Sequence, residues 1–381
     1  MNVLDALGKV VDIMKKYCDS RYVQYDDASS NNEYKTPQDY GAGGKGTTDD
    51  TEAINQAIKE NNTIFIPNGT YNISSPIIVN ASGKKIYGGS NTKIIAQGCD
   101  GFDVATPSNT IISDLQITGD GSAHHGIVVS GGGYRCQFVN LQVRGFGGDG
   151  FHTNWFGNGL GSCVITECAF RNCGNGIVCM SSALDQRNNL TISNNTIANT
   201  AHSAIRVTGC GISIEKNDIE QCEYAIRIDN WDAVPAREND EFCGTWAIRI
   251  VGNYMEGARR AFMSFASNYR VATETMPKLY GAVDGVTIQG NYAFLAKTIE
   301  TSDQHANVEF VTYTMDVERP IQDVTFEGNV FYMEKEPLPP LINGNGLLSE
   351  SCRFVISVES KGECVNMGNA VIVRASTTET E

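Results

Sequence analysis

One short phrase recurs between residues 139 and 329 and constrains the fold more than any other feature. It consists of an apolar residue, two spacers, an asparagine, one spacer and a second apolar residue. Its asparagines, the last two in looser copies, are Asn195, Asn217, Asn253, Asn291 and Asn329. Cys168 takes the asparagine position in an upstream copy, and Asp114 and Asn140 are assigned to weaker copies. One structural unit is therefore repeated along the chain.

A second phrase, a small residue followed by apolar, any and apolar residues, lies inside the first. Its copies begin at Gly126, Gly150, Gly176, Ala204, Ala225 and Ala261, so they start 24, 26, 28, 21 and 36 residues apart. A period of this size, with glycine and asparagine between short alternating runs, is typical of a solenoid whose units are strands.

These repeats predict an all-β fold, a parallel β-helix. One coil cannot bury its apolar face alone, so coils stack about 4.8 Å apart and share a core. Asparagines at one position of the coil can hydrogen-bond along the stack and satisfy turn backbone that water cannot reach. We therefore expect the five asparagines to form a ladder.

Composition excludes several functions. The chain of 381 residues has 44 acidic and 29 basic residues, a net charge of -15, which argues against nucleic-acid binding and against anionic membranes. No apolar run approaches 18 residues, so we expect no membrane insertion. The N-terminus lacks the basic start, apolar core and cleavage site of a signal peptide.

The twelve cysteines include no C-x-x-C pair, so we expect no zinc site, and nothing else indicates a metal or a cofactor. Cys168 and Cys179 fall at inward positions of the coil, where a free thiol packs as a small apolar residue. We expect reduced, structural cysteines in a protein made in a reducing cytoplasm.

Residues 1–35 are expected to form a separate segment for oligomerisation or attachment. Apolar residues with heptad spacing predict a helix over residues 1–21: Val3, Leu7, Val10, Met14 and Tyr17. Such a helix is too short to be stable alone. It either assembles with copies of itself or docks into a larger structure; the alternative is a helix that caps the solenoid. A polar linker follows.

A helix and two strands are predicted next. Asp49 and Glu52 have the spacing of a capping box, and Ile54, Ala57 and Ile58 give the following helix one apolar face. We expect the helix to end at residues 61–62, with strands over residues 63–66 and 71–73.

The same stretch carries a family resemblance. The sequence D-Y-G-A-G-G-K-G-T-T-D-D-T-E-A-I-N-Q-A-I from Asp39, followed by I-P-N-G-T-Y up to Tyr71, resembles the start of pectate-lyase-like β-helix proteins, especially phage tailspikes and capsule depolymerases. Lys45 stands where that family usually has aspartate. The resemblance implies a right-handed parallel β-helix over residues 36–340, but the motif caps the first coil and carries no chemistry.

Beyond the β-helix we expect a small β cap and tail over residues 341–381, with strands at residues 353–358 and 370–373. The asparagine spacing widens from 22 to 36 and 38 residues, so later coils should carry extra loops at residues 230–244, 266–284 and 300–322. Long loops on a rigid scaffold commonly hold functional residues.

The alternation of side chains locates a candidate site. Ile226 and Ile228 point inward, so Arg227 and Asp229 point outward. Aligned outward positions on other coils are His152, Asn154, Val178, Met180, Arg206, Thr208 and Met263. Neighbouring coils bring such side chains to roughly 5 Å, which predicts a polar cluster of Arg206, Arg227 and Asp229, with His152 two coils from Arg206.

Two chemistries fit this cluster. A glycosidase needs two carboxylates about 5 to 9 Å apart, and the candidates are Asp229, Asp232, Glu238 and Asp185. Aromatic residues for sugar rings would be Trp231, Trp246 and Tyr269. A lyase instead needs a base and cations that neutralise a uronate carboxylate, a role that suits Arg206 and Arg227. The alternative is an exposed salt-bridge ladder with no catalytic role.

Other polar residues carry weaker signals. Asp149, between two glycines, is interpreted as a turn residue. His124 and His202 occupy equivalent positions three coils apart, too far for a metal pair.

The resemblance and the candidate cluster together indicate a phage tailspike. It would be a homotrimer of the virion tail, made in the host cytoplasm and acting outside the cell. It would bind and cleave a bacterial surface polysaccharide and contact other tail proteins through its N-terminus. The alternatives are a non-catalytic receptor-binding adhesin and a free bacterial polysaccharide-degrading enzyme.

Overall fold

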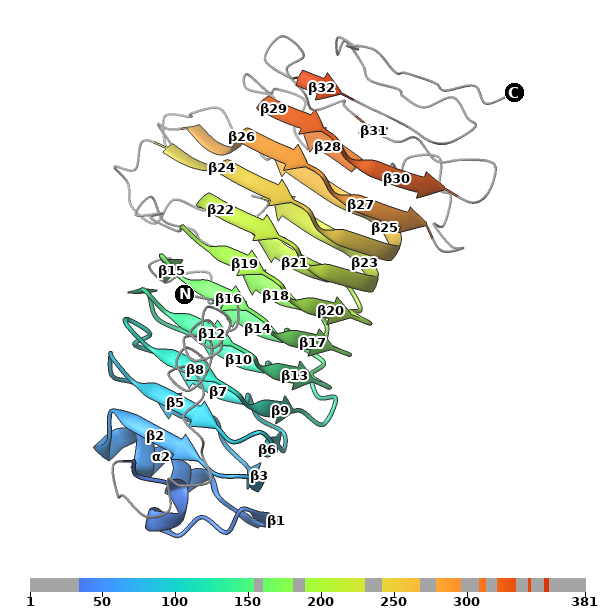
Figure 1. Cartoon of the computed structure of the whole chain (residues 1–381). Coiled ribbons are helices and arrows are strands. Elements are labelled where there is room, and N and C mark those ends of the chain that lie inside the picture. Colours follow the sequence, from blue (N-terminus) through green and yellow to red (C-terminus); the bar gives the residue numbers. More distant parts are fainter. Residues whose placement is uncertain are drawn as a thin grey trace, which may run out of the picture.

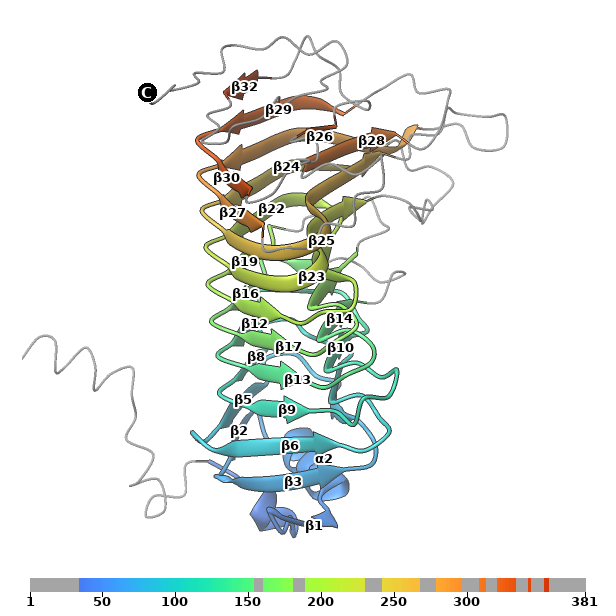
Figure 2. The same cartoon turned by 90° about the vertical axis from the view of Figure 1, so that its right-hand side faces the viewer.

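The computed structural model describes residues 34–153, 160–180, 189–229, 242–267, 279–295, 308–312, 321–333, 342–343 and 353–355. In this part of the chain the strands wind into a stack of coils, and every strand pairing is parallel (Figures 1 and 2). Each coil contributes one strand to each of three faces. The all-β parallel β-helix predicted from the repeats is confirmed.

The first face is an 11-stranded sheet. Its strands are β2 (Thr63–Ile66), β5 (Lys85–Gly88), β8 (Ile111–Ser113), β12 (Gln137–Val139), β16 (Val164–Thr166), β19 (Thr191–Ser193), β22 (Cys210–Glu215), β24 (Phe242–Val251), β26 (Leu279–Gln289), β29 (Gln322–Glu327) and β32 (Arg353–Val355).

The second and third faces merge because two long strands run through the corner between them, β23 (Asp218–Asp229) and β25 (Tyr254–Ser267). The second face also has β1 (Lys45–Asp49), β3 (Gly69–Ile73), β6 (Thr92–Ala96), β9 (Gln116–Thr118), β13 (Gln142–Arg144), β17 (Ala169–Arg171), β20 (Thr196–Ala198), β27 (Tyr292–Leu295) and β30 (Val330–Met333). The third face also has β4 (Ile77–Val79), β7 (Phe102–Val104), β10 (Ile127–Val129), β14 (Phe151–Thr153), β18 (Ile177–Cys179), β21 (Ser203–Val207), β28 (Val308–Thr312) and β31 (Ile342–Asn343). A separate pair, β11 (Gly133–Tyr134) and β15 (Leu160–Gly161), lies outside these faces.

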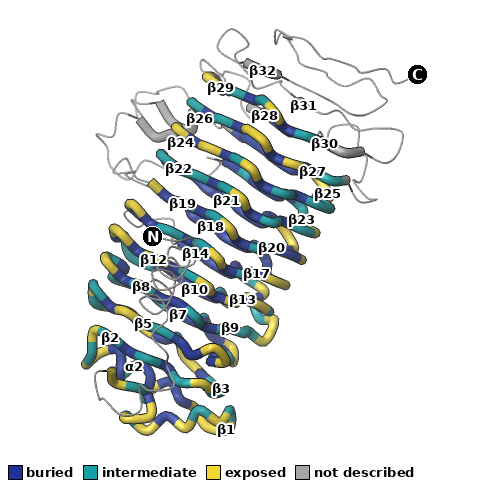
Figure 3. Tube along the Cα trace, viewed as in Figure 1, coloured by how far each residue is buried: buried dark blue, intermediate teal, exposed yellow. Residues whose placement is uncertain are grey.

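The core follows from the alternation of side chains. Inward residues are buried while many of their neighbours reach the surface, so burial alternates along most strands (Figure 3). Strands β10 and β18 are exceptions, because all three of their residues are buried. The small residue before each third-face strand is needed for close coil packing. A Cβ built on Gly150 would lie 2.6 Å from the Phe170 ring and 2.7 Å from the Gly176 carbonyl oxygen. These contacts explain the small residue of the second phrase.

One helix closes the first coil. Helix α2 (Thr51–Glu60) buries Ile54, Ala57 and Ile58, and a short 3₁₀ helix, η2 (Pro37–Tyr40), precedes it. The predicted capping box of Asp49 and Glu52 is wrong, because the N-cap residue is Asp50.

The residues around that N-cap have other partners. The Asp49 carboxylate accepts hydrogen bonds from the Thr51 backbone amide and the Ser74 hydroxyl, and the Asp50 carboxylate accepts from the Gly43 and Gly44 amides. The capping box instead joins Thr36 and Asp39 at η2.

The asparagine ladder is confirmed at the corner between the first and second faces. All five asparagines are at most 2% exposed, and each of the first four donates from its side-chain amide to the next asparagine's Oδ1 at 2.8–2.9 Å. Cys168 continues the ladder upstream, since its backbone N–H donates to Asn195 Oδ1. The assignment of Asp114 and Asn140 is wrong: both lie one position earlier, in left-handed turns, and the buried Leu115 and Leu141 take the ladder position.

The wide asparagine spacing is only partly explained by loops. Strands lengthen in the later coils, so residues 242–244, 266–267, 279–284 and 308–312, predicted as loop, belong to β24, β25, β26 and β28. Continuous parallel pairing of these long strands satisfies backbone groups that a loop would leave to water. The remaining loop segments lie outside the described residues, except Ile321 and Gln322, which form a bridge residue and the start of β29.

Both ends extend past the described part. The predicted N-terminal helix lies outside it, and β31 and β32 pair with β28 and β29 as a further partial coil. The rest of the predicted cap is not described. No helix among the described residues is long and apolar enough to cross a membrane. Eight cysteines have a described side chain; these eight are free, and seven of them are buried.

Candidate functional site

An outward-facing column of side chains runs along the third face. Strand pairing aligns one residue per coil in the order Asp103, Val128, His152, Val178, Arg206, Arg227, Ser264, Glu309. The predicted adjacency of Arg206 and Arg227, and the position of His152 two coils from Arg206, are confirmed by this register. The Arg227 guanidinium lies over the Tyr224 ring, 5.1 Å from its centroid.

The register corrects the alignment on the next coil. Ser264, and not Met263, pairs with Arg227, and Met263 is fully buried opposite Ile226. A bulge between Cys222 and Tyr224 shifts the two strands by one residue, which reverses the face of every later side chain.

Several predicted site residues cannot be placed. Asp229 ends β23 opposite Ala266, but its side chain is outside the described set. The residues that lie wholly outside it are Asn154, Asp185, Trp231, Asp232, Glu238 and Tyr269. Trp246 is described and does not lie on the third face; it is part of β24 on the first face, aligned with Cys210 and Asp284. The structure therefore brings together His152, Arg206 and Arg227 from the predicted set.

A second row of polar residues lies at the corner where the second face turns into the third. It occupies the position just before each small residue, and we call it the polar ladder: Asp100, His125, Asp149, Asn175 and Ser203. Three of its side chains accept a hydrogen bond from the backbone N–H of the next member. For His125 the acceptor is Nδ1, 2.8 Å from the Asp149 nitrogen.

Asp149 is the member that departs from this pattern. Its carboxylate accepts from the Asn175 side-chain amide through Oδ1, and its Oδ2 lies 2.7 Å from His152 Nδ1. Asp149 is only 7% exposed, and the His152 side chain keeps 26% of its surface exposed. Asp149 lies in the turn between β13 and β14, as expected, and its buried carboxylate also holds a histidine of the third-face column.

The hydrogen bonds fix how both histidine rings carry their protons. Burial raises the pKa of Asp149, but hydrogen bonds from His152 and Asn175 outweigh it and leave the pKa below its ordinary value. An ionised Asp149 requires His152 to donate from Nδ1, so the neutral His152 ring has its lone pair on Nε2.

His125 has the opposite tautomer. Because Nδ1 accepts from the Asp149 amide, the ring proton is on Nε2. Burial and the neighbouring His152 lower the pKa of His125, although Asp149 opposes them. The lowered pKa favours this neutral form. The two rings are stacked with centroids 4.3 Å apart.

A carboxylate that orients a histidine through Nδ1 and leaves Nε2 available is the arrangement of a general base. His125, Asp149 and His152 also offer ligand atoms within 4.8 Å of one another, a spacing that a divalent cation could use. Both Nδ1 atoms are already engaged in hydrogen bonds, which a cation would have to displace. We therefore interpret the cluster as a proton-transfer group.

Sequence reasoning selected His152 as a binding residue and missed the partner that orients it. The signal was present: His125 and Asp149 are 24 residues apart, the same spacing as Gly126 and Gly150, so they had to lie on adjacent coils.

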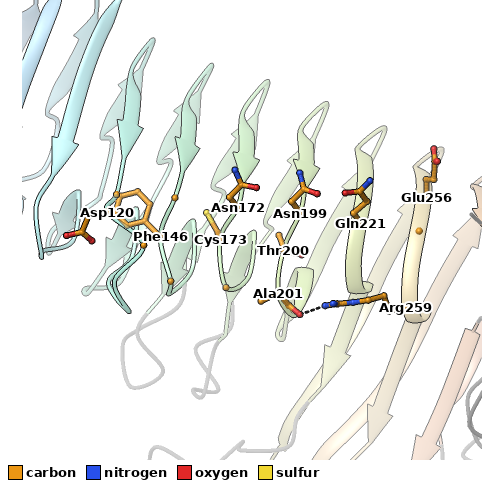
Figure 4. Close-up of a pocket in the computed structure, with 16 residues that line it drawn as sticks. Asp120, Phe146, Asn172, Cys173, Asn199, Thr200, Ala201, Gln221, Glu256 and Arg259 are labelled. Carbon is orange, nitrogen blue, oxygen red and sulfur yellow. Dashed lines mark hydrogen bonds between the residues drawn. The ribbon is translucent and has the colours of Figure 1, made fainter. Parts of the chain in front are cut away.

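A groove of about 1020 Å³ lies beside this corner (Figure 4). Residues from six successive coils line it, among them Asp120, Asn172, Thr200, Gln221, Glu256 and Arg259. It reaches Gly147 and Gly174, which immediately precede the Gly148–Asp149 and Asn175 turns of the polar ladder.

Comparison with known proteins confirms the resemblance found in the sequence. The family model "Rhamnogalacturonase A/epimerase, pectate lyase-like" matches residues 37–127, and the model "Right handed beta helix region" matches residues 125–275. The described coils are therefore a right-handed parallel β-helix, and residues 37–127 are similar to the pectate-lyase-like family. No curated protein sequence matches the chain.

Solved structures share the fold at low sequence identity. ORF18 of Geobacillus virus E2 aligns with a TM-score of 0.56 and 15% identity over 82% of this chain and 59% of its own, so this chain spans well under two thirds of that protein. The Agl-KA catalytic domain aligns with a TM-score of 0.53 and 14% identity, covering 85% of this chain and 69% of that one. The A-module of mannuronan C-5 epimerase AlgE6 from Azotobacter vinelandii gives 0.52 and 13%, covering 87% and 97%.

Proposed function

We propose that this protein binds and cleaves an acidic bacterial surface polysaccharide as a phage tailspike, and that cleavage is a β-elimination on the third face. The observation that carries the proposal is the alignment of His152, oriented by buried Asp149, with Arg206 and Arg227. A base on the same face as two arginines, two and three coils away along the column, suits a uronate, whose carboxylate must be neutralised before the adjacent proton can leave.

In this mechanism His152 Nε2 takes the proton from the carbon next to the uronate carboxylate. The electron pair of that C–H bond forms a carbon–carbon double bond, and the bond to the leaving oxygen breaks. Arg206 and Arg227 pair with the carboxylate as negative charge develops on it. The leaving oxygen takes a proton from an acid, for which Asp232, Glu238 and Asp185 are the candidates.

Hydrolysis by two carboxylates has less support. Among the described residues of the third-face column, the carboxylates are Asp103 near one end and Glu309 near the other, on either side of His152 and the arginines. They are seven coils apart by strand register, roughly 34 Å, whereas a glycosidase pair needs about 5 to 9 Å. Only Asp229 with a loop carboxylate would satisfy that spacing.

The relatives are consistent with a protein of this class. A viral protein and a mannuronan epimerase share the fold. We propose that the virion tail is the protein's place of action and that it acts as a homotrimer, attached through residues 1–35.

Product analysis tests the proposal. The purified protein is incubated with polygalacturonate, alginate and a panel of acidic bacterial capsules. β-Elimination creates an unsaturated sugar that absorbs ultraviolet light, whereas hydrolysis gives reducing ends without that absorbance. New reducing ends alone would contradict the lyase assignment, and binding without any new ends would make the protein an adhesin.

A further inference from the structure

We propose that the groove beside the corner of the second and third faces is a second binding site, for an extended uncharged stretch of polysaccharide. This inference rests on the proposed function only for the choice of a glycan as ligand. The groove is separate from the third-face column, since none of His152, Arg206 and Arg227 lines it.

The shape of the groove fits a linear chain. The residues that line it come from six successive coils, from residues 119–121 at one end to residues 256–259 at the other. Five coil spacings correspond to roughly 24 Å. Figure 4 shows Asn172, Asn199 and Gln221 in a row along it, each on its own ribbon. A polymer laid along the helix axis would meet one such side chain on each of three consecutive coils.

The row of amides is a second feature that fits a glycan. Asn172, Asn199 and Gln221 occupy the same corner position on consecutive coils, with φ of 54°, 56° and 52°, and all three are exposed. Glycine takes this position on both flanking coils, at Gly145 and Gly257. Each side-chain amide can donate and accept, which matches sugar hydroxyls.

The charges of the groove argue against the other linear polymers. Its charged residues are two acids, Asp120 and Glu256, and one base, Arg259. Hydrogen bonds from Ser122 and Gly98 lower the pKa of Asp120 to about 2, so this carboxylate stays ionised and repels anions. Nucleic acid requires a positive surface.

The apolar content also argues against a peptide partner. Phe146 and Cys173 are at most 4% exposed, so they form the floor and offer little apolar surface. The wall contains further polar groups: Arg259 donates to the Ala201 carbonyl, and buried Thr200 Oγ1 has no hydrogen-bond partner in the described part of the chain. An uncharged, hydroxyl-rich chain meets these groups best.

A pair of glycine variants isolates the amides. Asn199→Gly with Gln221→Gly removes two adjacent side chains, and the positive φ at both positions favours glycine, so folding is expected to be kept. The matched control is Asn194→Gly with Lys216→Gly. These two residues are also exposed, lie on adjacent coils at another corner and have φ of 56° each.

Affinity is measured on an array of purified neutral and acidic bacterial capsular polysaccharides and O-antigens. We expect the groove variant to bind the best ligand at least ten-fold more weakly than wild type, with the control variant within two-fold. Equal binding by the groove variant overturns the second site and leaves the proposed function standing.

Two other outcomes separate the claims. Wild-type protein that binds no glycan on the array overturns both the second site and the proposed function. Binding that depends on the groove amides, in a protein that cleaves nothing, supports the second site and overturns the proposed cleavage.

Discussion

Oδ2 of Asp149 lies 2.7 Å from Nδ1 of His152, three residues later along the chain and on the adjoining strand of the third face. This contact joins two rows of side chains that are otherwise distinct, the polar ladder at the corner and the outward column of the third face. The contact also fixes the tautomer of His152, because an ionised Asp149 requires the proton on Nδ1 and leaves the lone pair of the neutral ring on Nε2.

The polar ladder predicts a pH-dependent stability that one substitution should remove. The pKa of His125 is below its ordinary 6.5 in the folded protein. Between the two pKa values the unfolded chain binds a proton that the folded chain does not, so the free energy of unfolding falls as the pH drops below about 6.5. His125→Asn should abolish this dependence while keeping an acceptor for the Asp149 amide, as Asn175 does for Ser203.

Urea unfolding is measured at several pH values from about 7.5 to about 5, the range in which an ordinary histidine gains its proton. At neutral pH we expect the variant within about 1 kcal/mol of wild type. An unchanged slope in the variant would mean that His125 does not titrate with unfolding.

The asparagine ladder should contribute strongly to stability. Asn253 accepts from the Asn217 backbone and side chain and donates to Ile214 and Asn291. Asn253→Ala removes the acceptor of the Asn217 backbone N–H and the donor to the Ile214 carbonyl, and each buried group left without a partner costs about 1 to 3 kcal/mol. Asn291 Oδ1 still accepts from the backbone N–H of residue 253, and the Asn217 side chain still donates to the Ile192 carbonyl. We expect a large drop in the unfolding midpoint.

Cys168→Asn is the counterpart at the same position of the coil. Its side chain could donate to the Phe138 carbonyl, now 3.5 Å from the Cys168 thiol, and to Asn195 Oδ1. We expect unchanged or higher stability. Two results would show that the ladder does not act as described. One is an unfolding midpoint of Asn253→Ala equal to that of wild type, and the other is a Cys168→Asn variant that fails to fold.

The heptad pattern from Val3 to Tyr17, together with the resemblance to phage tailspikes, predicts a homotrimer. Light scattering of the full chain should give the mass of three 41.3 kDa subunits, and removal of residues 1–35 should lower it. A monomer that persists at high concentration with the N-terminus intact would rule this assembly out.

The two candidate carboxylates Asp229 and Asp232 predict a separable loss of activity. Asp229→Asn and Asp232→Asn should each lower turnover by about 100-fold or more without changing the melting temperature, since a surface acid contributes little to folding. Binding to host cells should persist in both. Full activity in both variants would remove these residues from the site.

The repeats were sufficient to predict the coils and the asparagine ladder, because periodic burial follows from the alternation of side chains. The helix that closes the first coil was predicted from its own apolar face at Ile54, Ala57 and Ile58. The register between neighbouring strands was harder to predict. The bulge after Cys222 moves Ser264 into the outward column, and no local pattern marks such a shift. Strand ends were also missed in the later coils, where pairing with neighbours extends strands through segments that look like loops.

Part of the candidate site could be predicted from the sequence for the same reason. Arg206, Arg227 and His152 share one face of alternating strands, which spacing alone reveals. Asp149 could be recognised only by asking which residues stack on it from the coils before and after. The groove amides could not be predicted from the sequence. A single asparagine in a left-handed turn is common, and only its alignment with amides on neighbouring coils indicates a binding surface.

The most direct test of the account is the turnover of His152→Gln on the polysaccharide that the wild-type protein cleaves. Gln keeps a polar side chain of similar reach but cannot accept a proton. We predict that the rate of formation of unsaturated product falls about 100-fold or more, with Kd for the polysaccharide and the melting temperature close to wild type. A variant that cleaves at a rate within a few-fold of wild type would contradict the assignment of His152 as the base.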